Sequence, residues 1–285
     1  MAAAAPQHIS DAAGGCGAEK PKGRFARLAR CTASRRLRFV MDEGEWKPAF
    51  SQPAGCWGRC GGRGYPAFRT ALLAAWTGCV LHSLADAHVA PSWLNALTHW
   101  GATLQDAYFG FAVLATSKAM YATKDSGGCP WYATAAWCLG STAPVISVMV
   151  CMLYWLLVYS PEQGAPGLVT WTMHGGNVAA TFLDLLTTSQ PYEMRHIYAP
   201  MVFAIAYIVF TYLYYVACGG WMYEVLNWSE PGRVLRLLAV IVFIAVPLCH
   251  TGLCGVVAMR RRCEGARAGA QELKAKERGE DCTEV

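Results

Sequence analysis

Charged residues are scarce in this chain of 285 residues, and its long middle section has very few of them. Only 15% of the residues are Asp, Glu, Lys or Arg, whereas a soluble globular domain usually carries about 25%. The charges gather toward the two ends, and from about Thr70 to Met259 the chain is one long apolar tract. This distribution excludes an ordinary soluble domain and predicts a multi-pass integral membrane protein.

The sequence also lacks cysteine and histidine pairs at zinc-binding spacing. Its 13 cysteines are scattered, and those within apolar runs behave as small hydrophobic residues. Cys56 and Cys60 form a single CxxxC with no second pair nearby. We therefore expect no metal and no cofactor. The net charge of +5 comes from basic tails, which favours contact with anionic membrane lipids and not with nucleic acid.

Three regions follow from this composition. Residues 1–66 have no sustained apolar period, and we predict a largely disordered, basic cytoplasmic tail there. Its stretch from Arg24 to Arg38 loosely resembles an organelle transit peptide, which remains an alternative, and no secretory signal peptide is expected. Residues 67–259 are predicted to form the transmembrane domain, and residues 260–285 a charged cytoplasmic tail.

The predicted fold class is an all-α membrane protein, a bundle of about six transmembrane helices. A membrane helix needs about 20 mostly apolar residues. The expected spans are residues 70–90, 97–120, 131–159, 172–188, 198–218 and 234–259. The fourth is the least apolar of the six and could be re-entrant instead of spanning.

The charges of the connecting loops predict the orientation. Two of the three connections assigned to the outer side, 88–96 and 160–171, contain no Lys or Arg, and the third contains one. The alternate connections carry Lys118, Lys124 and Arg195. Because both tails are also basic, both termini are expected in the cytoplasm, in the plasma membrane or the endoplasmic reticulum.

Polar side chains on the expected helices require an explanation, because burying them in hydrocarbon is costly. Four of them on the fourth span are spaced by three, four and three residues, which predicts one helical stripe facing the bundle interior. They are His174, Asn177, Thr181 and Asp184. Thr98, in the first turn of the second span, is expected at nearly the same depth as His174. A Thr hydroxyl can act as a nucleophile when a His accepts its proton, although such residues also serve as structural hydrogen-bonding groups between helices.

Several segments resemble those of Rolling stone-like membrane proteins. Residues 97–101 (LTHWG), followed by Tyr108 and Phe109, resemble the LTxW…YF segment of that family, and residues 174–177 (HGGN), 184–186 (DLL) and Pro191 resemble its HxxN…DLL…P segment. Further matches are residues 196–200 (HIYAP), 207–211 (YIVFT) and 223–228 (YEVLNW). The resemblance covers roughly residues 68–258.

Rolling stone-like proteins are similar to the FAR-17a-like androgen-induced proteins, six-helix hydrolases of fatty acid esters of hydroxy fatty acids. This resemblance implies a catalytic Thr near the start of the second helix and a His at the start of the fourth. These correspond to Thr98 and His174. In the Rolling stone branch hydrolysis is not implied, and a cell-fusion role is known for an animal member. The expected partners are membrane lipids.

Two other function classes remain open. In a non-catalytic membrane organiser or fusion factor the tails would carry the function, and the last four residues, CTEV, resemble a ligand of PDZ domains. A proton-coupled transporter would use the ionisable residues His82, Asp86, Asp106 and Asp184. The sequence shows no inverted repeat and no paired broken helices, which are the usual signs of a transporter.

Overall fold

The computed structural model describes residues 39, 41, 43–54, 64–86, 93–121 and 128–277. These residues are mostly helical, and within them the extended pairing is an isolated bridge between Pro53 and Thr188. The predicted PDZ-type end, the stretch from Arg24 to Arg38, and the pair Cys56 and Cys60 lie outside the described residues.

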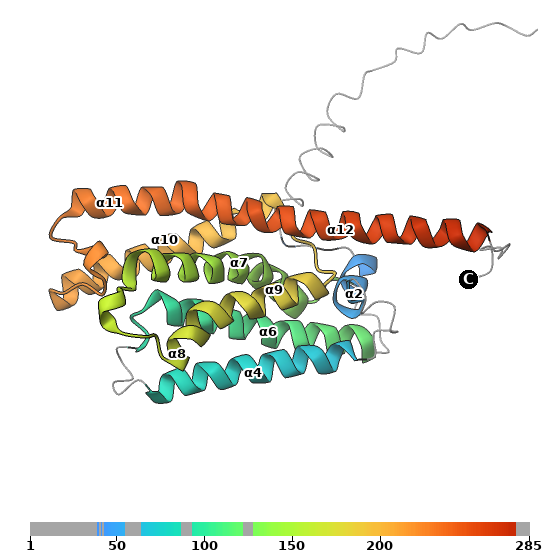
Figure 1. The fold of residues 1–285 in the computed structure, drawn as a ribbon, viewed down its shortest axis with the longest axis horizontal. Coiled ribbons are helices and arrows are strands. Elements are labelled where there is room, and N and C mark those ends of the chain that lie inside the picture. The colour runs from blue at the N-terminus through green and yellow to red at the C-terminus, as the bar shows by residue number, and fades with distance from the viewer. Residues whose placement is uncertain are drawn as a thin grey trace, which may run out of the picture. The chain divides into compact units, whose positions relative to one another are not determined.

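The α-helices run side by side, with α7 inside the group and α12 extending past the others (Figure 1). They are α2 (Glu43–Ser51), α4 (Tyr65–Asp86), α6 (Leu97–Tyr121), α7 (Trp131–Leu153), α8 (Leu168–Trp171), α9 (Asn177–Thr187), α10 (Tyr198–Cys218), α11 (Pro231–Val240) and α12 (Val246–Glu277). Three π-helical turns interrupt or extend them: η1 (Tyr154–Val158), η3 (Thr172–Gly176) and η6 (Ile241–Ala245). Short 3-10 turns are η2 (Pro161–Gln163), η4 (Met194–His196) and η5 (Glu224–Leu226).

Three helical stretches in the described part of the chain are long and apolar enough to cross a membrane. They are Trp131–Val158, Met194–Cys218 and Pro231–Gln271. Helices α4 and α6 have the length of a span, but polar residues are interspersed along them. The apolar helices support a membrane protein, while the count of six spans stays a prediction.

The predicted helix bounds agree with the structure at the second and fifth spans, which are α6 and α10. Helix α4 begins at Tyr65, five residues before the predicted start, so Arg69 lies inside it. The last helix continues to Glu277, through the region assigned to the charged tail. Charge limits a hydropathy-based span, but it does not stop the backbone from continuing as a helix.

The fourth predicted span is a continuous run of helical turns. Helix α8, the turn η3 and α9 follow one another from Leu168 to Thr187. At a rise of 1.5 Å per residue, such a run of about 20 residues covers about 30 Å. Its length is therefore compatible with spanning.

A short structured part lies within the head that the sequence predicts to be disordered. In α2, the side chains of Trp46 and Phe50 are fully buried, and Phe39 joins the same cluster with Trp137. Trp46 and Phe50 are four residues apart and so lie on one face of the helix. An apolar face of one turn is too short to produce the sustained period on which the sequence prediction depends.

Small residues allow α6 and α7 to approach closely, as is common between membrane helices. Ala102, Ala112 and Ala115 of α6 are buried. On α7, a Cβ atom at Gly140 would lie 2.7 Å from Cε2 of Tyr108 and 2.5 Å from Nε2 of Gln190. Gly140 therefore makes room for two polar side chains that belong to the network described below.

Candidate functional site

The polar stripe formed by η3 and α9 faces the interior, as its spacing predicts. His174, Asn177, Thr181 and Asp184 are 7%, 0%, 4% and 3% exposed. The stripe connects two chemically different places. We call them the network end, around Asp184, and the pocket end, around His174.

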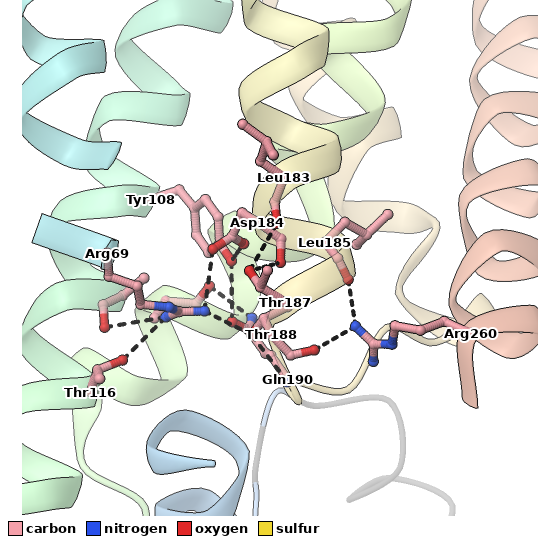
Figure 2. A network of polar contacts seen from close by, with 12 residues as sticks. Arg69, Tyr108, Thr116, Leu183, Asp184, Leu185, Thr187, Thr188, Gln190 and Arg260 are labelled. Carbon is pink, nitrogen blue, oxygen red and sulfur yellow. Dashed lines mark hydrogen bonds and ion pairs between the residues drawn. The ribbon is translucent and has the colours of Figure 1, made fainter. Parts of the chain in front are cut away.

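The network end contains a buried ion pair (Figure 2). Nη2 of Arg69 lies 3.3 Å from Oδ1 of Asp184 and donates a hydrogen bond of 2.7 Å to Oγ1 of Thr188. Nη1 of Arg69 lies 3.3 Å from both the carbonyl oxygen of Ala112 and Oγ1 of Thr116. Arg69 thus joins the first turns of α4 to the last turns of α6 and to the end of α9.

Further hydrogen bonds extend this network to other helices. The Tyr108 hydroxyl donates to Oδ2 of Asp184, and Nε2 of Gln190 donates to the carbonyl oxygen of Ala136 on α7. Nη1 of Arg260, on α12, donates to the carbonyl oxygens of Leu185 and Thr188 at 2.5 and 2.6 Å. Asp184, for which the sequence suggested a role only in the transporter hypothesis, is therefore a structural residue that holds helices together.

Sequence reasoning missed Arg69. It lies inside the predicted transmembrane domain, one residue before the first predicted span, and was not singled out, although it is only 2% exposed. The signal that could have found it is the unpaired Asp184 in the apolar tract, because a buried carboxylate needs a cation. Nothing in the sequence shows that Arg69, and not one of the other arginines, is the partner of Asp184.

An apolar cavity of about 100 Å³ lies next to the pocket end. Its walls come from α6, α7, α10, α11 and α12, and from the turns η1, η5 and η6. Thr98 is the only Ser, Thr or Cys among the described residues that line it. The other polar atoms of the wall belong to tyrosines.

Two of these tyrosines anchor the segment before α6. The Tyr207 hydroxyl donates to the carbonyl oxygen of Asn95 at 2.8 Å, and the Tyr223 hydroxyl accepts from the amide of Leu97 at 3.2 Å. Burial raises the pKa of the Tyr223 phenol, so it remains neutral at physiological pH. These contacts fix the first turn of α6, and with it the position of Thr98.

His174 lies in the π turn η3, and its ring stacks on Tyr154 with centroids 3.6 Å apart and planes within 6°. Its Nδ1 atom is buried and has no hydrogen-bond partner. Tyr154 also lines the cavity. The structure therefore places Thr98 in the wall of the pocket and His174 against another residue of that wall.

Two of the three π turns in the described part of the chain line this pocket, η1 through Tyr154, Leu157 and Val158 and η6 through Ile241. The third, η3, contacts its wall through the stacking of His174 on Tyr154. A π turn is less regular than an α-helix and is frequently found at functional sites. The position of a π turn cannot be obtained from hydropathy, so this arrangement was not predicted.

The four ionisable residues of the transporter hypothesis have different surroundings. Oδ1 of Asp106 accepts a hydrogen bond of 2.6 Å from Thr77, whereas Asp184 pairs with Arg69. His82 lines a second, separate hollow beside α8, and Asp86 is exposed. The structure does not gather them into one site.

The fold and the buried stripe define a class: a helical membrane protein with polar side chains inside its bundle. No protein-family model matches the chain. Over 109 residues, the chain is 25% identical to Protein rolling stone of Drosophila melanogaster, and the match covers 35% of this chain and 39% of that protein. No solved structure matches. The apolar helices and this similarity together indicate a membrane protein.

Proposed function

We propose that this protein hydrolyses fatty acid esters within the bilayer, with Thr98 as the nucleophile and His174 as the general base. The observation that supports the proposal most is the position of Thr98, which lines a largely apolar pocket. His174 supports it further, because its buried Nδ1 atom has no protein partner and its ring contacts another residue of the wall.

The reaction would proceed in two steps. Oγ1 of Thr98 attacks the ester carbonyl carbon while the His174 imidazole accepts the hydroxyl proton. The tetrahedral intermediate then collapses, and His174 returns that proton to the departing alcohol oxygen. A water molecule, deprotonated by His174, hydrolyses the acyl-Thr98 ester, releasing the fatty acid and restoring the Thr98 hydroxyl.

The chemistry of the walls suits an acyl chain. Aliphatic residues from α7, α10 and α11 form most of the lining, and they offer a chain the same apolar surroundings as the bilayer. We infer that the ester enters sideways from the membrane, since its chains already lie there. The cavity would hold the part of the chain nearest the carbonyl.

The test is turnover by purified protein of a fatty acid ester of a hydroxy fatty acid. We expect Thr98→Ala and His174→Ala each to lower kcat by at least about 100-fold, the lower range for general acid–base assistance. Thr98→Ser keeps a hydroxyl and should retain measurable turnover, which makes it the matched control. Unchanged turnover in both alanine variants would contradict the mechanism.

We also propose that six segments span the membrane with both termini in the cytoplasm. The network end supports an even alternation, because the start of α4 meets the ends of α6 and α9 there. Consecutive spans of opposite direction produce this arrangement. Epitope tags at each end should both be accessible only after the plasma membrane is permeabilised. A tag accessible on intact cells would exclude this orientation.

A second candidate is a non-catalytic membrane organiser, with the last four residues bound by a PDZ-type partner. The stacking of His174 on Tyr154 favours it, since a ring packed in this way can be purely structural. In that case Thr98→Ala would leave cellular function unchanged, whereas deleting residues 282–285 would alter localisation. If the protein is a hydrolase, Thr98→Ala should abolish cellular function, and deletion of residues 282–285 should leave localisation unchanged.

A further inference from the structure

Asn177 is a fully buried amide whose side chain has no partner. It lies in the first turn of α9 and is 0% exposed, and both Oδ1 and Nδ2 are without a hydrogen bond. One turn earlier on the same stripe, Nδ1 of His174 is also unpartnered. Two neighbouring polar groups inside the bundle thus have unused hydrogen-bonding capacity.

Gln105, which contacts the backbone of Asn177, does not supply the missing partner. Nε2 of Gln105 donates to the backbone carbonyl oxygen of Asn177 at 3.4 Å, and Oε1 of Gln105 accepts from Oγ of Ser147 at 2.7 Å. Gln105 is therefore engaged through both ends of its amide. Buried polar groups are hydrogen-bonded in nearly all proteins, so the Asn177 amide calls for a partner from outside the chain.

We propose that Asn177 binds the carbonyl group of the lipid whose chain occupies the pocket, with Nδ2 donating to the carbonyl oxygen. That the ligand is a fatty acid ester rests on the proposed function. Its position is argued from the chain itself. Asn177 and His174 do not line the pocket, but Asn177 lies one helical turn from His174, whose ring stacks on Tyr154 of the pocket wall. A carbonyl matches the amide because it is a strong acceptor on an otherwise apolar molecule.

The proposal predicts that the affinity for a lipid depends on its carbonyl group as well as on its acyl chain. An ester and the corresponding ether share chain length and shape, but the ether has no carbonyl oxygen. One hydrogen bond of about 1.4 kcal/mol corresponds to a tenfold difference in affinity. We therefore expect the ester to bind about tenfold more tightly than the ether.

The experiment uses the full chain in phosphatidylcholine nanodiscs. A fatty acid ester of a hydroxy fatty acid, carrying a diazirine and an alkyne, is crosslinked by light in the presence of unlabelled competitors. The competitors are the ester, its ether analogue and the free fatty acid. The wild-type protein should prefer the ester to the ether about tenfold, and Asn177→Leu should remove that preference. Thermal unfolding and elution of the variant by size exclusion establish that it is folded.

Ser141→Ala is the matched control. Ser141 is likewise 0% exposed with an unpartnered side-chain oxygen, but it lies on α7 next to Gly140, away from His174 and Asn177 in the chain. We expect this variant to keep the ester preference. Loss of the preference in Ser141→Ala as well as Asn177→Leu would overturn the assignment to Asn177.

The outcomes separate this inference from the proposed hydrolysis. Thr98→Ala should lose turnover yet keep the ester preference, because Asn177 is intact. If the free acid competes as well as the ester and Asn177→Leu weakens both, the carbonyl site stands and its ligand is a fatty acid. If the wild-type protein binds ester and ether equally, the inference fails, whatever the turnover of Thr98→Ala.

Discussion

The two ends of the polar stripe of η3 and α9 both bury polar side chains, but the chain supplies partners for these side chains at one end only. At the network end, Asp184 and Thr188 are bound by Arg69, Tyr108 and Arg260 from three other helices. At the pocket end, the Nδ1 atom of His174 and the whole Asn177 amide have no protein partner. The comparison teaches that burial alone does not mark a candidate site. Missing partners become informative where, as at His174, the residue also contacts the wall of a pocket.

The two ends of the stripe also contribute differently to the stability of the fold. A buried ion pair adds little net stability, because desolvation offsets its attraction, yet removing one partner is costly. The Arg69–Asp184 pair therefore determines that α4 and α9 are in contact and at which position along each helix they meet. Unpartnered groups such as Asn177 lower stability in the absence of a ligand, so binding is the reason we infer for their presence.

The largest expected effect is at the network end. Asp184→Asn leaves the Arg69 guanidinium without its carboxylate inside the bundle, and Arg69→Met leaves the carboxylate without its cation. We expect each to lower the free energy of unfolding by about 3–5 kcal/mol. Thermal unfolding in detergent, followed by size exclusion, measures this change.

The double variant Arg69→Met/Asp184→Asn provides the control for that prediction. With both charges removed, most of the lost stability should return, because the cost lies in the uncompensated charge. If the two single variants were as stable as the wild-type protein, Asp184 would not be the structural residue that separates the two ends.

Part of this comparison was accessible from the sequence. The spacing of His174, Asn177 and Asp184 predicted one buried stripe, and the bounds of α6 and α10 followed from apolar length alone. These features depend only on local periodicity, which one sequence contains. The pairing of Thr98 with His174 as catalytic residues stays a prediction, since it came from depth and from resemblance.

The remaining features depend on tertiary contacts and were not predictable from one sequence. Arg69 could be recognised as the partner of Asp184 only once α4 and α9 were side by side. The stacking of His174 on Tyr154 needs two π turns from different spans. Hydropathy specifies neither the rotation of a helix nor a local π turn, so it could not assign partners along the stripe.

The smallest expected effect is at the pocket end, and it is the sharpest test of the comparison. In detergent without added lipid, Asn177→Leu replaces an unpartnered amide with an apolar side chain of similar size. We expect the free energy of unfolding to stay within about 0.5 kcal/mol of the wild-type value or to rise by about 1–3 kcal/mol, the usual penalty of an unsatisfied buried group. The same thermal unfolding assay used for Asp184→Asn measures it, so the two ends are compared directly. A loss as large as that of Asp184→Asn would mean that Asn177 holds the helices together, and the distinction between the two ends would fail.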